Sequence, residues 1–296
     1  MVRLYSADVP GEVYLKLESL QPVGSFKIRG AFNAVSLLQP EERAKGVWTV
    51  SAGNAAQGVA LAARIVGVPC NVLVMDTAPA AKLDAIKRLG AGIIQASMDE
   101  CWQAVTERAH PAFQGVFVHP FDDDNFIAGN GTIGLEILED LPDVTSVVAA
   151  FGGGGLSCGI ASALAALRPE TKVYAAEPET AAPLHLSFLK GSPQKFPEWK
   201  TSWVDGCGGK SVLPSMWTLA GRLLAGSIVT SHEETRRALE IVAARNHVIC
   251  EGAAACAVAA GISGKAGSGK IVCVVSGGNI DLNKFAELVS TAGAKS

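Results

Sequence analysis

Apolar runs that end in glycine-rich turns are the feature that most restricts how this chain can fold. Helical segments follow these turns, so strand, turn and helix alternate along most of the sequence. Such repeats predict an α/β fold in which helices cover both faces of a parallel sheet. Ligands of these folds bind beyond the carboxyl ends of the strands, where the turns lie. The turns in question read SAGN (51–54), GGGG (152–155), EGAAA (251–255) and SGGN (276–279).

Hydrophobic periodicity indicates where the individual elements lie. Strands are expected at 12–18, 46–51, 71–76, 92–96, 115–120 and 172–178, and in the runs 146–155 and 270–279, which end in glycines. Helices are expected at 26–38, 55–67, 80–89, 100–109, 125–141, 157–167 and 232–246. The region 181–226 has the weakest periodicity, and we expect loops and short helices there.

Composition excludes several classes of protein. The net charge of −3 gives no electrostatic basis for binding nucleic acid or an anionic membrane. No apolar run reaches the roughly 18 residues that a membrane-spanning helix needs, and the first residues lack the layout of a signal peptide. The seven cysteines include no CxxC pair, which favours buried free thiols in a reducing compartment. We therefore expect a cytoplasmic protein.

Lys27 stands at the start of a predicted helix, in the stretch GSFKIRGAF (24–32). A solvated lysine on a first helical turn is the ordinary interpretation, just as the run 152–155 is by itself explained by a tight turn. A glycine turn before a helix can also bind phosphate through its backbone N–H groups. Together, a phosphate-binding turn and a nucleophilic lysine describe a site for pyridoxal 5′-phosphate (PLP), which forms a Schiff base with a lysine amine. Partial desolvation beside Phe26 would lower the pKa of the lysine, as this role requires.

Six stretches carry a resemblance to a known family. In order along the chain they read KLESLQPVGSFKIRGA, SAGNAAQGVALAA, IAGNGTIGLEIL, FGGGGL, YAAEPE and VVSGGN. This set closely resembles the serine/threonine dehydratase (ammonia-lyase) family of fold-type II PLP enzymes, to which serine racemase is related. The resemblance covers nearly the whole chain. It implies a fold like that of the tryptophan synthase β subunit, with two domains built on parallel sheets and the cofactor in the cleft between them.

The resemblance also implies roles for individual residues. Lys27 would form the Schiff base and later remove the Cα proton of the substrate. The residues expected to bind the cofactor are Phe26, Lys27, Asn54, Gly152, Gly153, Gly154, Gly155, Leu156, Gly206, Glu251 and Ser276. The residues expected to bind the substrate are Ser51, Ala52, Asn54 and Ala55. A serine hydroxyl at position 276 would donate to a neutral pyridine nitrogen, and the resulting weaker electron sink suits elimination better than transamination.

Two of the departures from the family pattern bear directly on function. Racemases of the group carry a serine where this chain has Ala52, so we expect little racemase activity. The family's metal site would correspond to the Glu177 side chain and the Ala181 backbone carbonyl, but Pro183 replaces an acidic ligand. A monovalent or divalent cation therefore remains one interpretation of Glu177, and a glutamate with a structural role at a strand end is the other.

The function implied is that of a PLP-dependent lyase, an L-serine/L-threonine dehydratase that converts a hydroxy-amino acid into a 2-oxo acid and ammonia. Alternatives are a serine racemase, a 3-hydroxyaspartate dehydratase and a non-catalytic amino-acid-binding module. Residues 89–107 contain no Lys or Arg to meet a second substrate carboxylate, which counts against hydroxyaspartate.

The domain organisation is expected to be discontinuous. Residues 1–37 and 124–296 would form a large PLP-binding domain, and residues 38–123 a smaller inserted domain that carries the SAGN turn. Closure of the domains over the substrate would exclude water. We expect a small-molecule substrate as the partner, no nucleic acid or membrane, and allow for a homodimer.

Overall fold

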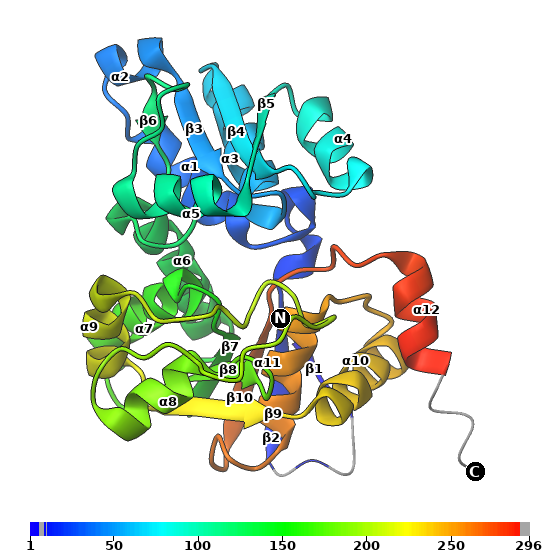
Figure 1. Cartoon of the computed structure of the whole chain (residues 1–296). Coiled ribbons are helices and arrows are strands. Elements are labelled where there is room, and N and C mark those ends of the chain that lie inside the picture. The colour runs from blue at the N-terminus through cyan, green and yellow to red at the C-terminus, as the bar shows by residue number, and fades with distance from the viewer. Residues whose placement is uncertain (6–8, 10, 291–296) are drawn as a thin grey trace. The chain divides into compact units, whose positions relative to one another are not determined.

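The computed structural model describes residues 1–5, 9 and 11–290 of the 296-residue chain. It divides into two compact units, Met1–Gly24 with Gly131–Ser296 and Ser25–Asn130, and each unit has its own sheet (Figure 1). These bounds differ from the predicted domain ranges, because helix α1 (Lys27–Ser36) belongs to the smaller unit rather than the larger one. The reason is local packing: α1 lies against helix α3 (Asn54–Val66) of the same unit.

The smaller unit is built on a four-stranded parallel sheet in the order β5-β4-β3-β6. Its strands are β3 (Val47–Val50), β4 (Cys70–Met75), β5 (Gly92–Ala96) and β6 (Val116–Phe117). Besides α1 and α3, its helices are α2 (Pro40–Lys45), α4 (Ala80–Arg88) and α5 (Met98–Glu107). Trp48 anchors one side of the sheet, with ring centroids 4.7 Å from Phe113 and 4.4 Å from Phe117.

The larger unit is built on a six-stranded sheet in the order β1-β2-β10-β7-β8-β9. All neighbouring pairs are parallel except β1 with β2. The strands are β1 (Val2–Arg3), β2 (Glu12–Leu17), β7 (Ser146–Ala150), β8 (Lys172–Pro178), β9 (Gly226–Thr230) and β10 (Lys270–Val275). The helices are α7 (Gly155–Leu167), α8 (Pro183–Lys190), α9 (Pro214–Leu223), α10 (His232–Asn246), α11 (Gly252–Ile262) and α12 (Leu282–Ser290), and α6 (Asp124–Asp140) runs from one unit into the other. Two short 3-10 turns occupy Glu18–Leu20 and Pro22–Gly24.

Helix α11 forms the centre of the larger unit's core. Its sequence, GAAACAVAAGI, is almost entirely small and apolar, and every residue from Gly252 to Gly261 is buried. Small side chains let the helix lie close to β7, β8 and β10 while α10 covers its other side. The carboxyl ends of β7 and β10, which lead into the GGGG and SGGN turns, are therefore held by a closely packed core.

The predicted α/β class with parallel sheets is confirmed. The prediction that EGAAA (251–255) ends a strand is wrong, because residues 247–250 have no regular structure and EGAAA instead begins α11. Strand β9 and helices α2 and α12 were not predicted. Within the described residues, no helix combines the length and apolar character needed to cross a membrane.

Candidate active site

Lys27 is the first residue of α1, and its side chain is half-buried within the smaller unit. Its Nζ atom donates a hydrogen bond of 2.6 Å to the carbonyl oxygen of Pro120. The same atom lies 5.1 Å from the ring centroid of Phe26 and 5.3 Å from that of Phe126. An amine held by a carbonyl and two aromatic rings is not the solvated lysine of the ordinary interpretation.

Close packing of α1 on α3 fixes the backbone at Lys27. A Cβ atom at Gly58 of α3 would lie 3.0 Å from the carbonyl carbon and oxygen of Lys27 and 3.1 Å from its Cβ. These separations are tighter than ordinary van der Waals contacts, so a larger residue would have to displace α1. Gly58 therefore contributes to the placement of the lysine, although its sequence context did not single it out.

The turn from Ser51 to Ala55 joins β3 to α3, in the same unit as Lys27. The Ser51 hydroxyl oxygen accepts a hydrogen bond of 3.0 Å from the backbone N–H of Gly53. Asn54 begins α3, and Gly53, at the N-cap position, has no side chain with which to cap the helix. A helix N-terminus without a capping side chain suits a carboxylate ligand. Ala52 places only a methyl group in this turn.

The GGGG turn joins β7 to α7 in the larger unit. Helix α7 begins at Gly155, and its N-cap residue Gly154 has a φ of +98°, a conformation that favours glycine. A Cβ atom at Gly152 would lie 2.7 Å from the carbonyl oxygen of Gly206, and one at Gly154 would lie 2.8 Å from the Phe151 ring. Side chains are therefore excluded from the start of a 13-residue helix. This cradle, at the positive end of the helix dipole, fits a phosphate group.

The other predicted cofactor-binding residues of the larger unit lie beside this cradle. A Cβ atom at Gly206 would lie 3.7 Å from Oε1 of Glu251, and one at Gly277 would lie 2.5 Å from the same oxygen. The Glu251 N–H donates to the Gly277 carbonyl at 3.0 Å, next to Ser276, which is 2% exposed. The residues brought together in this unit are Gly152, Gly153, Gly154, Gly155, Leu156, Gly206, Glu251 and Ser276.

Glu177, the predicted metal ligand, is completely buried at the end of β8. Oε1 accepts from the N–H of Leu184 at 2.9 Å, and Oε2 accepts from the N–H of His185 at 2.8 Å and from the Ser227 hydroxyl at 2.6 Å. The carboxylate thus binds the N-terminus of α8. Burial raises the pKa of Glu177 to about 7, although these three hydrogen bonds oppose the shift.

A metal site at Glu177 stays a prediction. The Ala181 N–H donates to the Pro178 carbonyl in a tight turn after β8, so Ala181 lies near Glu177 in sequence and in the fold. Among the described residues, no group of three or more His, Cys, Asp or Glu side chains is arranged to hold a metal ion. Both carboxylate oxygens of Glu177 already have protein donors, which supports the structural interpretation of this residue.

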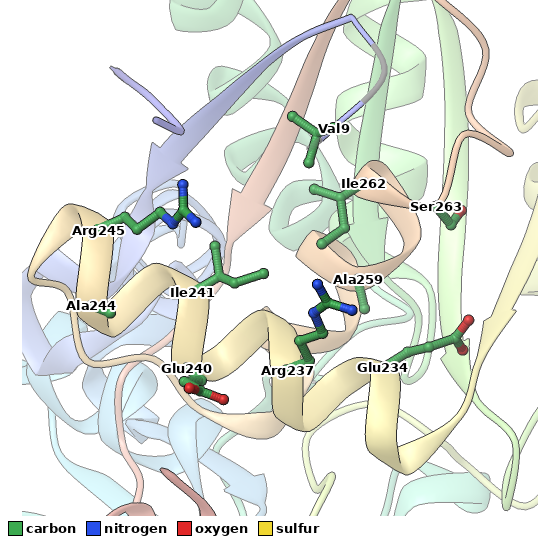
Figure 2. Close-up of a pocket in the computed structure, with 10 residues that line it drawn as sticks. All are labelled: Val9, Glu234, Arg237, Glu240, Ile241, Ala244, Arg245, Ala259, Ile262 and Ser263. Carbon is green, nitrogen blue, oxygen red and sulfur yellow. The ribbon is translucent and has the colours of Figure 1, made fainter. Parts of the chain in front are cut away.

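A cavity of about 490 Å³ lies elsewhere in the larger unit, along α10 and the end of α11. Figure 2 shows its lining by charged residues of α10, such as Arg237 and Glu240, and by apolar residues such as Ile241 and Ile262. None of the predicted site residues lines it. The cavity is therefore separate from the predicted site residues.

Sequence reasoning missed Pro120, whose carbonyl contacts the lysine amine, and its chain neighbour His119. His119 is 1% exposed, and its Nδ1 accepts from the N–H groups of Phe121 at 3.3 Å and Asp122 at 2.9 Å. Burial lowers the pKa of His119 to about 4. Lys27 and Pro120 are 93 positions apart in the chain, so local sequence patterns do not predict their contact.

The fold and these residues describe an α/β protein with a half-buried lysine at the start of a helix and a glycine turn that fits a phosphate. The chain belongs to the family of pyridoxal-phosphate dependent enzymes, whose family model matches residues 2–277. PLP is accordingly its cofactor, and the glycine cradle described above fits the phosphate of that cofactor.

Known relatives agree with this assignment. The chain is 40% identical to an L-threonine ammonia-lyase from Thermotoga maritima, over 97% of this chain and 72% of that protein. It is 36% identical to the catabolic L-threonine dehydratase of Escherichia coli (strain K12), over 98% of this chain and 89% of that protein.

Two solved structures are also similar, each with a TM-score of 0.87 and 32% identity. The processed form of threonine deaminase isoform 2 from Solanum lycopersicum matches 96% of this chain and 84% of its own. Maize serine racemase matches 95% of this chain and 88% of its own.

Proposed function

We propose that this protein is a PLP-dependent ammonia-lyase that acts on L-threonine and L-serine. L-Threonine would give 2-oxobutanoate and ammonia, and L-serine would give pyruvate and ammonia. The water lost in the elimination is balanced by the water consumed when the enamine product, after tautomerising, is hydrolysed. The observation that carries the proposal is the similarity of 36–40% over at least 94% of the chain to proteins named as threonine ammonia-lyases or dehydratases.

Lys27 is the residue proposed to bond the cofactor and to move the Cα proton. When bound, PLP supplies an aldehyde that joins amino groups and a conjugated ring that accepts negative charge from Cα. The hydrogen bond from Nζ to the Pro120 carbonyl holds the amine in one direction. The rings of Phe26 and Phe126 lie beside the amine, with centroids 5.1 Å and 5.3 Å from Nζ. The cradle at 152–155, with Leu156, would bind the phosphate, and Gly206 and Glu251 would border the ring.

The substrate carboxylate is proposed to bind at the N-terminus of α3, where Ser51 and Asn54 lie. The positive end of the helix dipole favours an anion there. Asn54 adds a side-chain amide, and Ala52 and Ala55 leave room for the substrate.

Ser276 is proposed to face the pyridine nitrogen of the cofactor. A serine hydroxyl donates a hydrogen bond but carries no charge, so it does not stabilise a protonated ring nitrogen as a carboxylate does. Charge at Cα is then relieved best by rapid loss of the β-hydroxyl group, which favours elimination over transamination.

Serine racemase is the second candidate, because a plant serine racemase is among the similar structures. Racemisation needs an acid–base group on each face of the substrate, and Ala52 has none to offer. We therefore expect negligible conversion of L-serine to D-serine by the purified protein, measured by chiral chromatography. Conversion at a rate comparable to that of 2-oxo acid formation would refute this expectation.

A cytoplasmic location is also proposed. All seven cysteines are free and buried, which is the form that a reducing compartment maintains. The sequence allows for a homodimer, and light scattering of the purified protein would measure the oligomeric state.

The decisive experiment is a 2-oxo acid assay with L-threonine, L-serine, D-serine and 3-hydroxyaspartate. Wild type should turn over the first two, and Lys27→Ala should lose at least about 1,000-fold in kcat, as expected for removal of a covalent nucleophile. The same variant should lack the absorbance near 410–420 nm of a lysine-bound PLP. Lys45→Ala, at an exposed lysine of α2, is the matched control. Full turnover by Lys27→Ala, or a protein that stays colourless with added PLP, would refute the proposal.

A further inference from the structure

The Pro120 carbonyl that accepts from Lys27 Nζ is part of a tightly constrained turn, residues 119–122. Proline fixes its own φ and has no N–H group, so Pro120 contributes to this turn only through its carbonyl oxygen and its ring. The direction of the carbonyl, and therefore the position of the Lys27 amine 2.6 Å away, depends on what holds the rest of the turn.

The His119 ring holds the turn from the inside. Its Nδ1 atom accepts hydrogen bonds from two consecutive backbone N–H groups, those of Phe121 and Asp122. The ring is itself fixed by edge-on contacts with Phe117 and Phe121, whose ring centroids lie 5.5 Å and 4.5 Å away. The side chain thus closes the turn that contains Pro120 and has little freedom to move.

Arg108 holds the turn from the outside. Its Nη2 atom donates to the main-chain oxygen of Asp122 at 2.7 Å and to the carboxylate of the same residue at 2.8 Å. Half of the Arg108 side chain is exposed, so this ion pair is weaker than a buried one. The buried histidine is therefore the more important of the two supports.

The ring has to be neutral for this arrangement. Two backbone N–H groups donate to Nδ1, so that atom must be the unprotonated acceptor. The proton of the neutral ring therefore lies on Nε2. Burial, together with the positive charges of Arg108 and Lys27, lowers the pKa of His119 to about 4, while Asp122 opposes the shift. The neutral form is the stable one at any pH at which the enzyme would work.

We propose that His119 is a positioning residue for the Lys27 amine: its Nδ1 atom fixes the 119–122 turn so that the Pro120 carbonyl directs Nζ. The inference rests on the proposed function, because it assumes that Lys27 is the PLP-binding residue. The proposed role of His119 requires no contact with substrate or cofactor, because the residue acts through the turn.

Three variants separate positioning from general stability. His119→Asn keeps an acceptor where Nδ1 lies, whereas His119→Phe keeps an aromatic ring and loses the acceptor. His110→Phe is the matched control, because the His110 Nδ1 also accepts a backbone N–H, that of Ala112 at 3.3 Å, and its ring also packs on aromatic neighbours. These neighbours, Trp48 and Phe113, lie outside the 119–122 turn.

The readouts are amide hydrogen exchange across 119–122 in the protein without PLP, the rate at which absorbance at 410–420 nm appears on adding PLP, and kcat. In His119→Phe we expect faster exchange at Phe121 and Asp122, whose N–H groups both lose their acceptor, and colour formation and kcat each at least about tenfold lower. His119→Asn should stay within about threefold of wild type, since it keeps the acceptor. His110→Phe should match wild type.

The proposal would be overturned if His119→Phe and His119→Asn had the same rate of colour formation and the same kcat, whether these values were equal to or lower than those of wild type. If His119→Phe does not fold, His119→Gln takes its place, because its longer side chain carries the amide past the Nδ1 position. Failure of the proposed function looks different. Wild type would form no 2-oxo acid, but amide exchange across 119–122 would still be faster in His119→Phe, which lacks the acceptor, than in His119→Asn, which keeps it.

Discussion

At the scale of single residues, the structure shows polar groups whose partners come from distant parts of the chain. The stretch around Lys27 alone was ordinarily explained by a solvated lysine, and its importance was predicted only because six stretches of the chain together resemble a known family. The acceptor of the Lys27 amine, the Pro120 carbonyl, was not predictable, because every residue has a backbone oxygen and the sequence does not show which one the amine will reach. Glu177 was singled out as a metal ligand, but its hydrogen bonds to Leu184 and Ser227 depend on how β8, α8 and β9 pack.

Glu177 makes the stability of the larger unit depend on pH. Burial raises its pKa to about 7, above the ordinary value of 4.5, so between these values the folded state binds more protons than the unfolded state. The free energy of unfolding should therefore fall as pH rises through this window. Glu177→Gln does not titrate, so the stability of wild type minus that of the variant should decrease by about 3 kcal/mol from pH 4.5 to 7.5. Urea unfolding at several pH values measures this difference.

Glu139→Gln, at an exposed glutamate of α6, is the control for this titration. Its stability difference from wild type should stay constant over the same range. A difference for Glu177→Gln that is equally flat would show that the carboxylate is ionised throughout, with its three donors outweighing burial.

At the scale of elements, glycine turns after apolar runs predicted most of the architecture correctly. SAGN and GGGG follow β3 and β7 as expected, because a parallel strand buried on both faces must be apolar and needs a tight exit to its helix. EGAAA was misassigned, since an alanine-rich helix in the core looks like the end of a buried strand. Strand β9, GSIVT, was missed because it is a short strand at the edge of the sheet, and within the described residues it pairs with β8 alone.

The contact between α1 and α3 predicts the effect of Gly58→Ala. Alanine favours a helix over glycine by about 1 kcal/mol, but its Cβ would press on the Lys27 backbone at 3.0 Å. We expect a melting temperature within about 5 °C of wild type, together with a tenfold or larger fall in kcat as Lys27 moves. Differential scanning fluorimetry and the 2-oxo acid assay measure the two effects.

Gly221→Ala, in α9 of the larger unit, is the matched control for this helix contact. A Cβ atom there would lie 3.4 Å from the Trp217 ring, an ordinary contact, so the variant should keep wild-type kcat. A wild-type kcat for Gly58→Ala as well would mean that α1 shifts without disturbing the lysine.

At the scale of the whole molecule, the seven thiols report on the integrity of both units. All are buried, and burial raises the pKa of Cys70, Cys158, Cys250 and Cys273 to about 12. The reactive thiolate is therefore scarce as well as shielded. Ellman's reagent should label none of the seven within minutes in the native protein and all seven in guanidinium chloride. Rapid labelling of a thiol in the native state would reveal local opening around it.

The pairing of β2 with β10 has a consequence for synthesis on the ribosome. Residues 12–17 of β2 pair with residues 270–275 of β10 in the folded sheet. During synthesis β2 is therefore made long before its partner strand β10. At the usual speed of translation this interval is on the order of tens of seconds. During this time the nascent β2 has only the two-residue β1 beside it, and we expect chaperones that shield unpaired strands to matter more for the yield of this protein than its final stability does.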